Sequence, residues 1–132
     1  MECQVGDIIV VSNFKSQGQA VKRHSFVVVS TEKGQIQGLD YDLVCNVMSS
    51  FHSPEHRQKK MGYPGNFEYA AEQENVKGGH GKPGYIKAEQ FYYFDSEKID
   101  YYVIGNVYPD LLKALFQYIE SLDKIEHITD NL

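Results

Sequence analysis

The sequence predicts a mainly β domain that ends in a single helix. Short runs rich in Val, Ile, Tyr and Phe recur as far as residue 107, and clusters of Gly, Pro, Asn and Asp separate them. Such runs are typical of strands joined by turns. Strands and helices do not alternate along the chain, as they would in a parallel sheet. We therefore expect a small antiparallel barrel with a helix across one opening.

The expected strands follow the apolar runs in order. The first run, IIVV, comes directly after Gly6 and Asp7, and the second, FVVV, is apolar and mostly β-branched, which favours a strand buried on both faces. The polar segment before the second run, ending at Ala20, predicts a flexible loop. The strands predicted in this way are residues 8–11, 21–31, 35–41, 42–48, 67–71, 85–94 and 101–107.

Two long connections interrupt the predicted strands. Residues 49–66 and 72–84 are polar and rich in Gly and Pro. Connections of this length in compact domains are usually functional or mobile. We therefore expect binding residues on them.

The helix is predicted from Pro109, a residue that is well tolerated at the first helical position. One apolar stripe follows, with polar residues opposite, and it should pack against the sheet. Residues 123–132 are expected to be a frayed tail. The stripe consists of Leu111, Leu112, Leu115, Phe116, Ile119 and Leu122.

Length and composition indicate one globular domain over residues 1–132. The content of 42% apolar and 23% charged residues is ordinary for such a domain. No apolar run approaches the roughly twenty residues of a membrane span, and the first residues lack the pattern of a signal peptide. We expect a cytoplasmic protein that does not bind membranes. Cys3 and Cys45 form neither a disulfide framework nor a metal motif.

The charge is unevenly distributed, although the net charge is −5. Residues 11–87 hold ten Lys or Arg against seven acids, whereas residues 88–132 hold three against nine. The positive charge lies in three patches, residues 15–24, 52–60 and 77–87. If folding brings these patches together, an acidic protein would present one cationic face to an anion.

The ordered set of motifs resembles the MazF/PemK/Kid family of toxins. The set consists of GDIIVV, a loop with SQGQAVKRH leading into FVVVSTEKG, then DLVCNVMSS, GYIKAEQFYYFDSEKI and finally IGNV before the helix. The corresponding family order is a GD-plus-apolar strand, a Gly-containing loop, an RP dipeptide before a Val/Ile strand, a strand ending in Thr or Ser, and an LLEQ-like strand. The resemblance extends from Gly6 to about Leu122.

The resemblance implies a compact SH3-like barrel that forms a homodimer. It also implies a metal-independent endoribonuclease that cleaves single-stranded RNA and needs no cofactor. A partner antitoxin with an extended acidic segment would occupy the RNA groove and inhibit the enzyme. The alternatives are a noncatalytic barrel that binds nucleic acid or peptide, and an accessory protein with a structural role.

The resemblance assigns catalytic positions residue by residue. Arg23 stands where the family has the arginine of its RP pair, and Ser49 or Ser50 stands near the hydroxyl that closes the third strand. Residues 16–22 match the flexible loop that gates the substrate. The chain departs from the family at His24, which replaces Pro, and at Met48, which aligns with the hydroxyl. A shift of one residue reverses the face of a side chain, so Ser49 and Ser50 cannot both replace that hydroxyl.

Cleavage of RNA without a metal uses the ribose 2′-OH as the nucleophile. Arg23 suits stabilisation of the phosphate, because a guanidinium binds phosphate oxygens in a fork and keeps its charge. His24 suits the role of general base or acid. Neighbours in a strand point to opposite faces, so these two residues share a site only if the backbone is irregular. Ser49 or Ser50 would orient the phosphate by hydrogen bonding.

The remaining basic and polar loop residues are expected to contact the RNA backbone. The alternative is that these loops are simply solvated. His52 and His56 have the spacing of a helical metal pair, but Pro54 argues against a helix and no third ligand is evident, so no metal site is predicted. The expected RNA contacts are Lys15, Ser16, Gln17, Lys22, His52, His56, Arg57, Lys59, Lys60, Lys77, His80 and Lys82.

Overall fold

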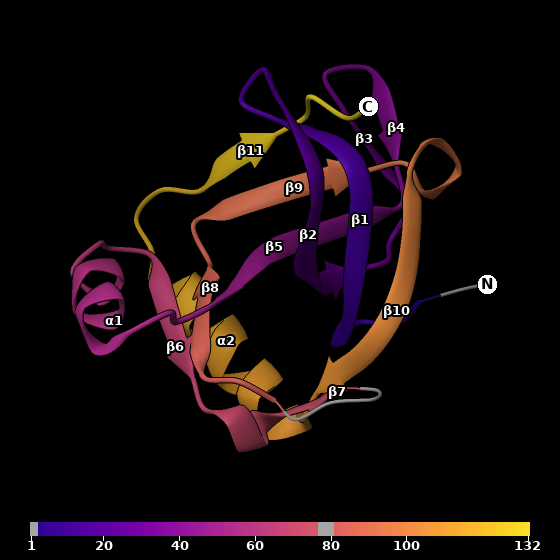
Figure 1. Ribbon diagram of the computed structural model, residues 1–132. Helices are drawn as coiled ribbons and strands as arrows, with labels where there is room; N and C mark the ends of the chain where they lie inside the picture. Colours follow the sequence, from indigo (N-terminus) through magenta and orange to yellow (C-terminus); the bar gives the residue numbers. More distant parts are fainter. Residues whose placement is uncertain (1–2, 77–80) are drawn as a thin grey trace.

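The computed structural model describes residues 3–76 and 81–132. Within these ranges the chain is mainly β, with two α-helices and two single 3₁₀ turns (Figure 1). The elements in order are β1 (Asp7–Ser16), β2 (Gln19–Ser30), β3 (Gly34–Ile36), β4 (Leu39–Tyr41), β5 (Leu43–Ser50), α1 (Pro54–Met61), β6 (Asn66–Tyr69), η1 (Ala71–Gln73), β7 (Glu74–Val76), β8 (Gly84–Lys87), β9 (Gln90–Phe94), η2 (Ser96–Lys98), β10 (Asp100–Val107), α2 (Pro109–Glu120) and β11 (Glu126–Ile128).

The core lies on both faces of the central strands β1, β2 and β5. Phe26 and Val28 of β2 belong to one hydrophobic cluster, which β9 and Ile128 complete. Val27 belongs to a second cluster, which α2 and β8 cover from the other side. Phe26, Val27 and Val28 are all fully buried. The prediction that the FVVV run is buried on both faces is confirmed for these three residues, and Val29 is partly exposed.

The described strands form an open sheet rather than the expected closed barrel. One path runs in the order β11-β9-β5-β2-β1-β10-β7; β8 also pairs with β5, and β6 pairs with β8. All pairs are antiparallel except β11 with β9, and the end strands β7 and β11 do not pair with each other. β3 and β4 form a separate hairpin. The prediction of a mainly β chain with an antiparallel sheet is confirmed, whereas the predicted closure into a barrel is not.

The loop between the first two strands is a tight hairpin, so the expectation of a flexible loop is wrong. Ser16 pairs directly with Gln19, and the two residues between them, Gln17 and Gly18, both have positive φ angles, of 52° and 83°. This conformation matches the type I′ turn, whose twist fits a two-residue connection between antiparallel strands. The polar composition of residues 16–20 therefore reflects solvent-exposed strand ends and a turn.

The C-terminal residues 123–132 do not fray, contrary to expectation. β11 pairs in parallel with β9, and Ile128 is buried in the first hydrophobic cluster. The tail then reaches the β1–β2 hairpin. The backbone amide of Gly18 donates to Asp130 Oδ2 at 2.7 Å, and Asn131 exchanges two hydrogen bonds with the backbone of Lys15. The short alternation in residues 126–128 was too weak a strand signal to detect in sequence.

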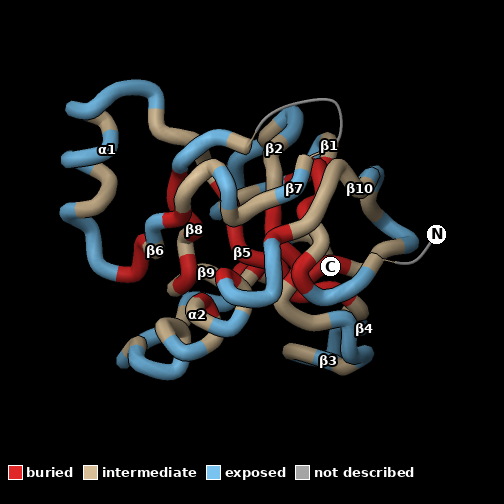
Figure 2. Tube along the Cα trace, turned by 90° about the horizontal axis from the view of Figure 1, so that it is seen from below, coloured by how far each residue is buried: buried red, intermediate tan, exposed pale blue. Residues whose placement is uncertain are grey.

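The predicted connection 49–66 contains helix α1. Ser53 caps the helix by accepting a hydrogen bond from the His56 amide at 3.0 Å, and Pro54 takes a position at its start. Proline is favoured there, because the first turn has no partner for its N–H. The argument from Pro54 against a helix was therefore wrong. No residue of α1 is buried, and Figure 2 shows the helix projecting from the body of the molecule.

The C-terminal helix α2 forms as predicted. Leu111 and Leu115 are buried, and Leu112, Ile119 and Leu122 pack against the same cluster.

The predicted strand 85–94 is divided into β8 and β9, which pair with opposite ends of β5. Asn46 stabilises this break by donating to the Gln90 carbonyl at 2.8 Å. No helix in the described parts of the chain is long and apolar enough to cross a membrane.

The buried tail predicts a measurable contribution to stability. Ile128→Ala should lower the free energy of unfolding by roughly 2 to 4 kcal/mol, because it removes a buried side chain and leaves a cavity. Urea denaturation of the purified protein measures this change. Ile125→Ala, at a partly exposed position of the same tail, is the matched control and should cost less. Equal, negligible losses for both variants would contradict the anchored tail.

Candidate functional site

The candidate site lies where β2 and β5 separate. The two strands pair from Ser30 as far as Ser25, which lies opposite Met48. Beyond that point β5 pairs instead with β8, whereas β2 continues with β1 toward the hairpin (Figure 1). Across the opening, Ser49 Oγ and His24 Nε2 lie 3.5 Å apart. The separation of the strands leaves polar side chains at the edge of a buried sheet.

A pocket of about 440 Å³ occupies this opening. We call it the histidine pocket, because residues from three segments bring two imidazoles and an ammonium group to its walls. His24 comes from β2, His52 from the turn before α1, and Lys82 from the segment before β8. The pocket is lined by His24, Ser25, Met48, Ser49, Ser50, Phe51, His52 and Lys82.

A second pocket of about 310 Å³ continues from the first toward the hairpin. His24 and Ser49 line both pockets, and Lys60 and Lys87 add positive charge to the second. We call it the hairpin pocket. It is lined by Phe14, Ser16, Gln17, Val21, His24, Val47, Ser49, Lys60, Tyr85, Lys87, Gln90 and Tyr92. The two pockets together form a groove lined by residues from all three basic patches, with Lys60, Lys82 and Lys87 as its lysines and His24 as its titratable residue from the first patch.

The contacts of the His24 ring indicate which of its two nitrogens can accept a hydrogen bond. Nδ1 lies 3.1 Å from the carbonyl oxygen of Ser25. A carbonyl only accepts, so the neutral ring carries its proton on Nδ1 and leaves a lone pair on Nε2. Nε2 is the nitrogen that faces Ser49 across the opening. With the proton on Nδ1, Nε2 is an acceptor, and the Ser49 hydroxyl is the group that can donate to it.

The second imidazole, His52, lies at the entrance to α1. Its backbone amide donates to His56 Nδ1 at 3.1 Å, and the two rings lie 4.5 Å apart. Partial desolvation, together with the nearby His52, Lys60 and Lys59, lowers the pKa of His56. His56 therefore favours the neutral state and supports His52 and the turn, whereas the exposed His52 ring lines the pocket.

Arg23 does not join His24 in the groove. β2 pairs regularly with β1 at both residues, so its side chains alternate and Arg23 lies on the face opposite His24. Arg23 is exposed and lines neither the histidine pocket nor the hairpin pocket. The three basic segments thus converge on His24 and Ser49 rather than on the arginine. Ser49 and Ser50 both line the histidine pocket, because the strand pairing changes beside them.

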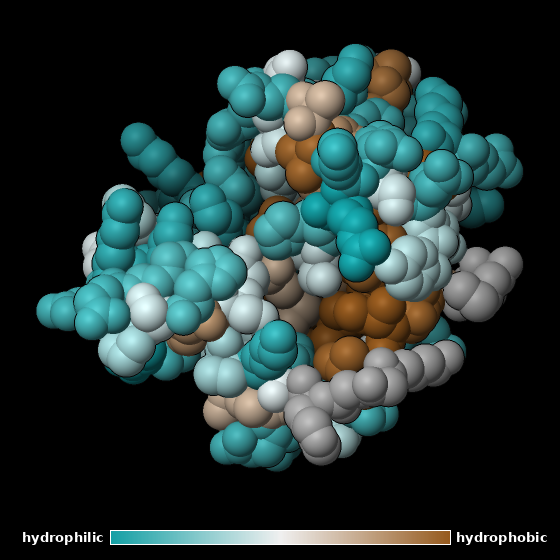
Figure 3. Space-filling view, viewed as in Figure 1, coloured by the Kyte–Doolittle hydropathy of each residue, from teal (hydrophilic) through white to brown (hydrophobic). Residues whose placement is uncertain are grey.

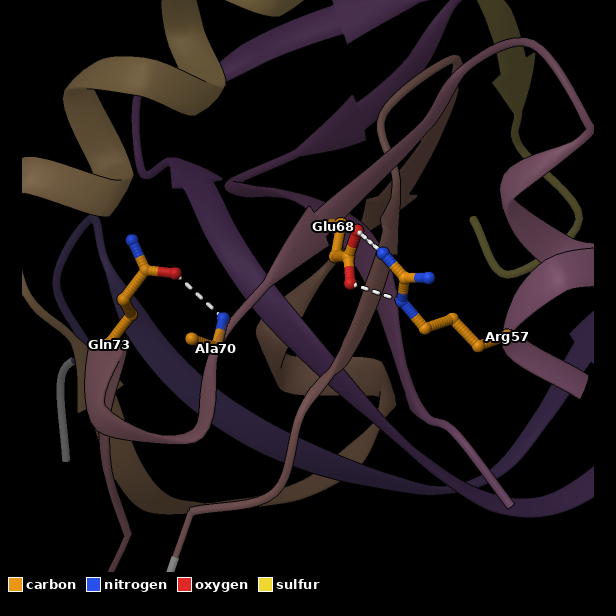
Figure 4. A network of polar contacts seen from close by, with 4 residues as sticks. All are labelled: Arg57, Glu68, Ala70 and Gln73. Carbon is orange, nitrogen blue, oxygen red and sulfur yellow. Dashed lines mark hydrogen bonds and ion pairs between the residues drawn. The ribbon is translucent and has the colours of Figure 1, made fainter. Parts of the chain in front are cut away.

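Only some of the expected RNA contacts lie in the groove, and His56 lines neither the histidine pocket nor the hairpin pocket. Ser16, Gln17, Lys60, His52 and Lys82 line the groove. Arg57 instead forms a two-pronged ion pair with Glu68 of β6, at 2.7 and 2.8 Å, as Figure 4 shows. Lys15, Lys22 and Lys59 are exposed and line neither pocket. Lys77 and His80 lie outside the described residues.

Sequence reasoning missed three residues that the structure brings to the site. Lys87 was counted in a basic patch but not among the RNA contacts, and Ser25 and Glu74 were not considered. Alternation in GYIK places Lys87 and Tyr85 on one face of β8, and this signal together with the basic patch could have pointed to Lys87. Ser25 and Glu74 gave no signal, because their positions depend on pairing between distant strands.

A third pocket, of about 210 Å³, adjoins the histidine pocket on its other side. We call it the Glu74 pocket. Burial raises the pKa of the Glu74 carboxyl, although a hydrogen bond from the Lys82 amide at 3.0 Å partly opposes this. Figure 3 shows hydrophobic surface gathered where β1, β7 and β10 meet. The pocket is lined by Ile8, Ser25, Met48, Ser50, Tyr69, Glu74, Val76, Lys82 and Ile104.

The comparisons identify no relative on which a role for the groove could be based. No protein-family model matches the chain, and a search of curated proteins finds no match either. Among the described residues, no three His, Cys, Asp or Glu side chains are grouped so that they could hold a metal ion. The chemistry of the site therefore has to be argued from its own side chains.

The raised pKa of Glu74 predicts how stability depends on pH. Below its ordinary pKa, Glu74 is protonated in both the folded and the unfolded chain, so it does not change the free energy of unfolding. As the pH rises toward the raised pKa, the unfolded chain loses its proton first, so the folded state is destabilised. The stability of Glu74→Gln relative to the wild type should therefore be higher at pH 7.5 than at pH 4.

Denaturation in urea at both pH values measures this difference. The exposed Glu72→Gln is the matched control, because it removes the same charge outside the pocket. An equal pH-dependent gain in both variants would show that net charge, not burial of Glu74, is responsible.

Proposed function

We propose that the chain binds single-stranded RNA in its groove and cleaves it without a metal ion, by attack of the ribose 2′-OH on the adjacent phosphate. The observation that supports this most is the histidine pocket, in which His24, His52 and Lys82 surround one open space. Two imidazoles and an ammonium group supply a proton acceptor, a proton donor and a positive charge. Imidazoles ordinarily titrate near neutral pH and can act in either role.

Each residue has one task in the proposed reaction. His24 Nε2 takes the proton from the 2′-OH, whose oxygen forms a bond to phosphorus. Lys82 and the hydroxyl of Ser49 or Ser50 stabilise the charge on the phosphate oxygens. His52, in its protonated form, donates a proton to the departing 5′ oxygen as its bond to phosphorus breaks. The products are a 2′,3′-cyclic phosphate and a 5′-hydroxyl end.

The hairpin pocket extends the proposed RNA path. Lys60 and Lys87 lie on its walls and would pair with phosphates flanking the reacting one. Ser16 and Gln17 at the hairpin tip would contact the ribose or phosphate. The hydrogen bonds between the tail and the hairpin hold this side of the groove in place without a ligand.

The toxin-like identity is part of the same proposal. An open, curved version of the SH3-like barrel of the MazF/PemK/Kid type would accommodate the order of the strands, and a homodimer would be its usual assembly. An antitoxin with an extended acidic segment would compete with RNA for Lys60, Lys82 and Lys87. Such a pair would act in the cytoplasm.

A noncatalytic RNA-binding protein is the second candidate. The position of Arg23 favours it, because the arginine that would stabilise the phosphate in the family lies outside the groove. In this alternative, Lys60, Lys82 and Lys87 bind the RNA backbone, and the protein does not cleave it.

The first test is cleavage of a long single-stranded RNA in the presence of EDTA. His24→Ala should reduce the cleavage rate by about 10² to 10⁴-fold, because it removes the proton acceptor. His52→Ala should cause a comparable loss, whereas Arg23→Ala should change the rate less than about threefold, a limit far below that of acid–base groups.

The matched control is His127→Ala, which removes an imidazole that contacts Tyr93 rather than the groove. Loss of cleavage in Arg23→Ala with full activity in His24→Ala would overturn the roles given to the histidines. Binding of the RNA with no cleavage by the wild-type protein would establish the noncatalytic alternative.

The second test is the salt dependence of RNA binding, which counts phosphate contacts. For single strands, each neutralised phosphate contributes about 0.7 to the slope of log K against log salt concentration. Lys82→Ala and Lys87→Ala should each reduce the slope by about this amount. Lys113→Ala, on the exposed face of α2, should leave the slope unchanged. Unchanged slopes in the two groove variants would place the RNA elsewhere.

A further inference from the structure

The Glu74 pocket is a separate cavity beside the proposed reaction site. Four residues, Ser25, Met48, Ser50 and Lys82, line both this pocket and the histidine pocket. A nucleotide whose phosphate lies beside His24 and Ser49 can therefore direct its base into the Glu74 pocket. The proposed reaction uses only the sugar and the phosphate, so it leaves this cavity without a role.

The walls of the cavity suit a flat, aromatic group. Apolar surface comes from four strands of the sheet, through Ile8 of β1, Met48 of β5, Val76 of β7 and Ile104 of β10. Bases that leave the stack are commonly held between aromatic or apolar side chains. The cavity has a volume of about 210 Å³, so the part of an occupant that enters it is of about this size.

The polar groups in the cavity favour one kind of base edge. Glu74 Oε1 already accepts the Lys82 amide, and no described residue forms an ion pair with the carboxylate. An ionised carboxylate only accepts hydrogen bonds, so an occupant that binds to it has to present donors. The hydroxyls of Ser25 and Ser50 lie on the same walls and can donate or accept.

Among the four RNA bases, guanine presents the best set of donors to a carboxylate. Its N1–H and N2–H groups are adjacent and point in the same direction, so they can bind both carboxylate oxygens. Cytosine and adenine each present one amino group beside an acceptor. Uracil presents a single N–H between two carbonyl oxygens, which a carboxylate repels.

We propose that the Glu74 pocket binds a guanine base next to the phosphate at the histidine pocket and so makes RNA recognition sequence-selective. This inference rests on the proposed RNA-binding function and adds the base that is recognised. Glu74 and the apolar walls select the base, whereas His24, His52 and Lys82 act on the backbone irrespective of sequence. A partly buried carboxylate beside a groove lined by lysines is otherwise unfavourable for binding a polyanion.

The test compares two hexamers that differ in one base. Both carry 2′-O-methyl groups, which prevent cleavage; one is all uridine, and the other has a single guanosine at the third position. Fluorescence anisotropy at fixed salt measures both affinities. The guanosine hexamer should bind about tenfold more tightly, which corresponds to about 1.4 kcal/mol and lies within the range of a base-edge contact.

Glu74→Gln should remove this preference, because an amide presents one acceptor and one donor in place of two acceptors. Glu72→Gln, outside the pocket, should keep the full preference. Circular dichroism checks that both variants are folded.

Failure of this inference is distinguishable from failure of the RNA-binding function. Equal affinity of the wild-type protein for both hexamers overturns the guanine pocket and leaves RNA binding intact. A preference that persists in Glu74→Gln also overturns it, because the discrimination would then lie elsewhere. Binding of neither hexamer overturns both proposals. A tenfold preference that disappears only in Glu74→Gln supports the assignment, whether or not the protein cleaves RNA.

Discussion

The structure depends on the pairing of β2 with β1 on one side and β5 on the other. Val27 packs toward α2 and β8, and Phe26 and Val28 pack toward β9 and the tail, so the strand has hydrophobic cores on both faces. A strand buried in this way has little freedom to change register, because a shift of one residue would exchange its two faces. The positions of all side chains on β2, including those beyond the core, follow from this constraint.

The candidate site is a consequence of where that pairing stops. β5 leaves β2 after Met48 and continues with β8, so the last residues of the ladder border an opening rather than the core. Alternation then directs His24 toward the hairpin pocket and Ser25 toward the Glu74 pocket. Lysines line the opening although the chain is acidic overall, because among the described residues no Asp or Glu lines the histidine pocket or the hairpin pocket. The C-terminal segment, residues 88–132, holds nine acidic residues.

That acidic segment also has a structural function. Its last residues pair with β9 and bind the backbone of the β1–β2 hairpin through Asp130 and Asn131. These contacts join the C-terminal tail to the β1–β2 hairpin and fix one wall of the groove. The turn at Gln17 and Gly18 is held by the pairing of β1 with β2 and by the C-terminal tail. A mobile gating loop, in contrast, makes few contacts with the rest of the protein.

Much of the fold could be predicted from sequence, because strong local patterns specify it. The apolar runs of β1, β2 and β5 and the stripe of α2 have enough length and periodicity to be recognised. Two elements with weak local signals were missed. Helix α1 buries no residue, and its contacts include the Ser53 cap and the ion pair between Arg57 and Glu68. Strand β11 has three residues, which pair with β9.

The sequence by itself determined the main strands β1, β2, β5 and β10, the helix α2, and the presence of three basic segments along the chain. Only the tertiary structure decided that these segments meet at His24 and Ser49, that Arg23 faces away, and that Glu74 lies beside the same opening. The physical reason is that these positions depend on pairing between residues far apart in the chain. Local composition describes the preference of a residue for a strand or a loop and contains no information about the partner across the sheet.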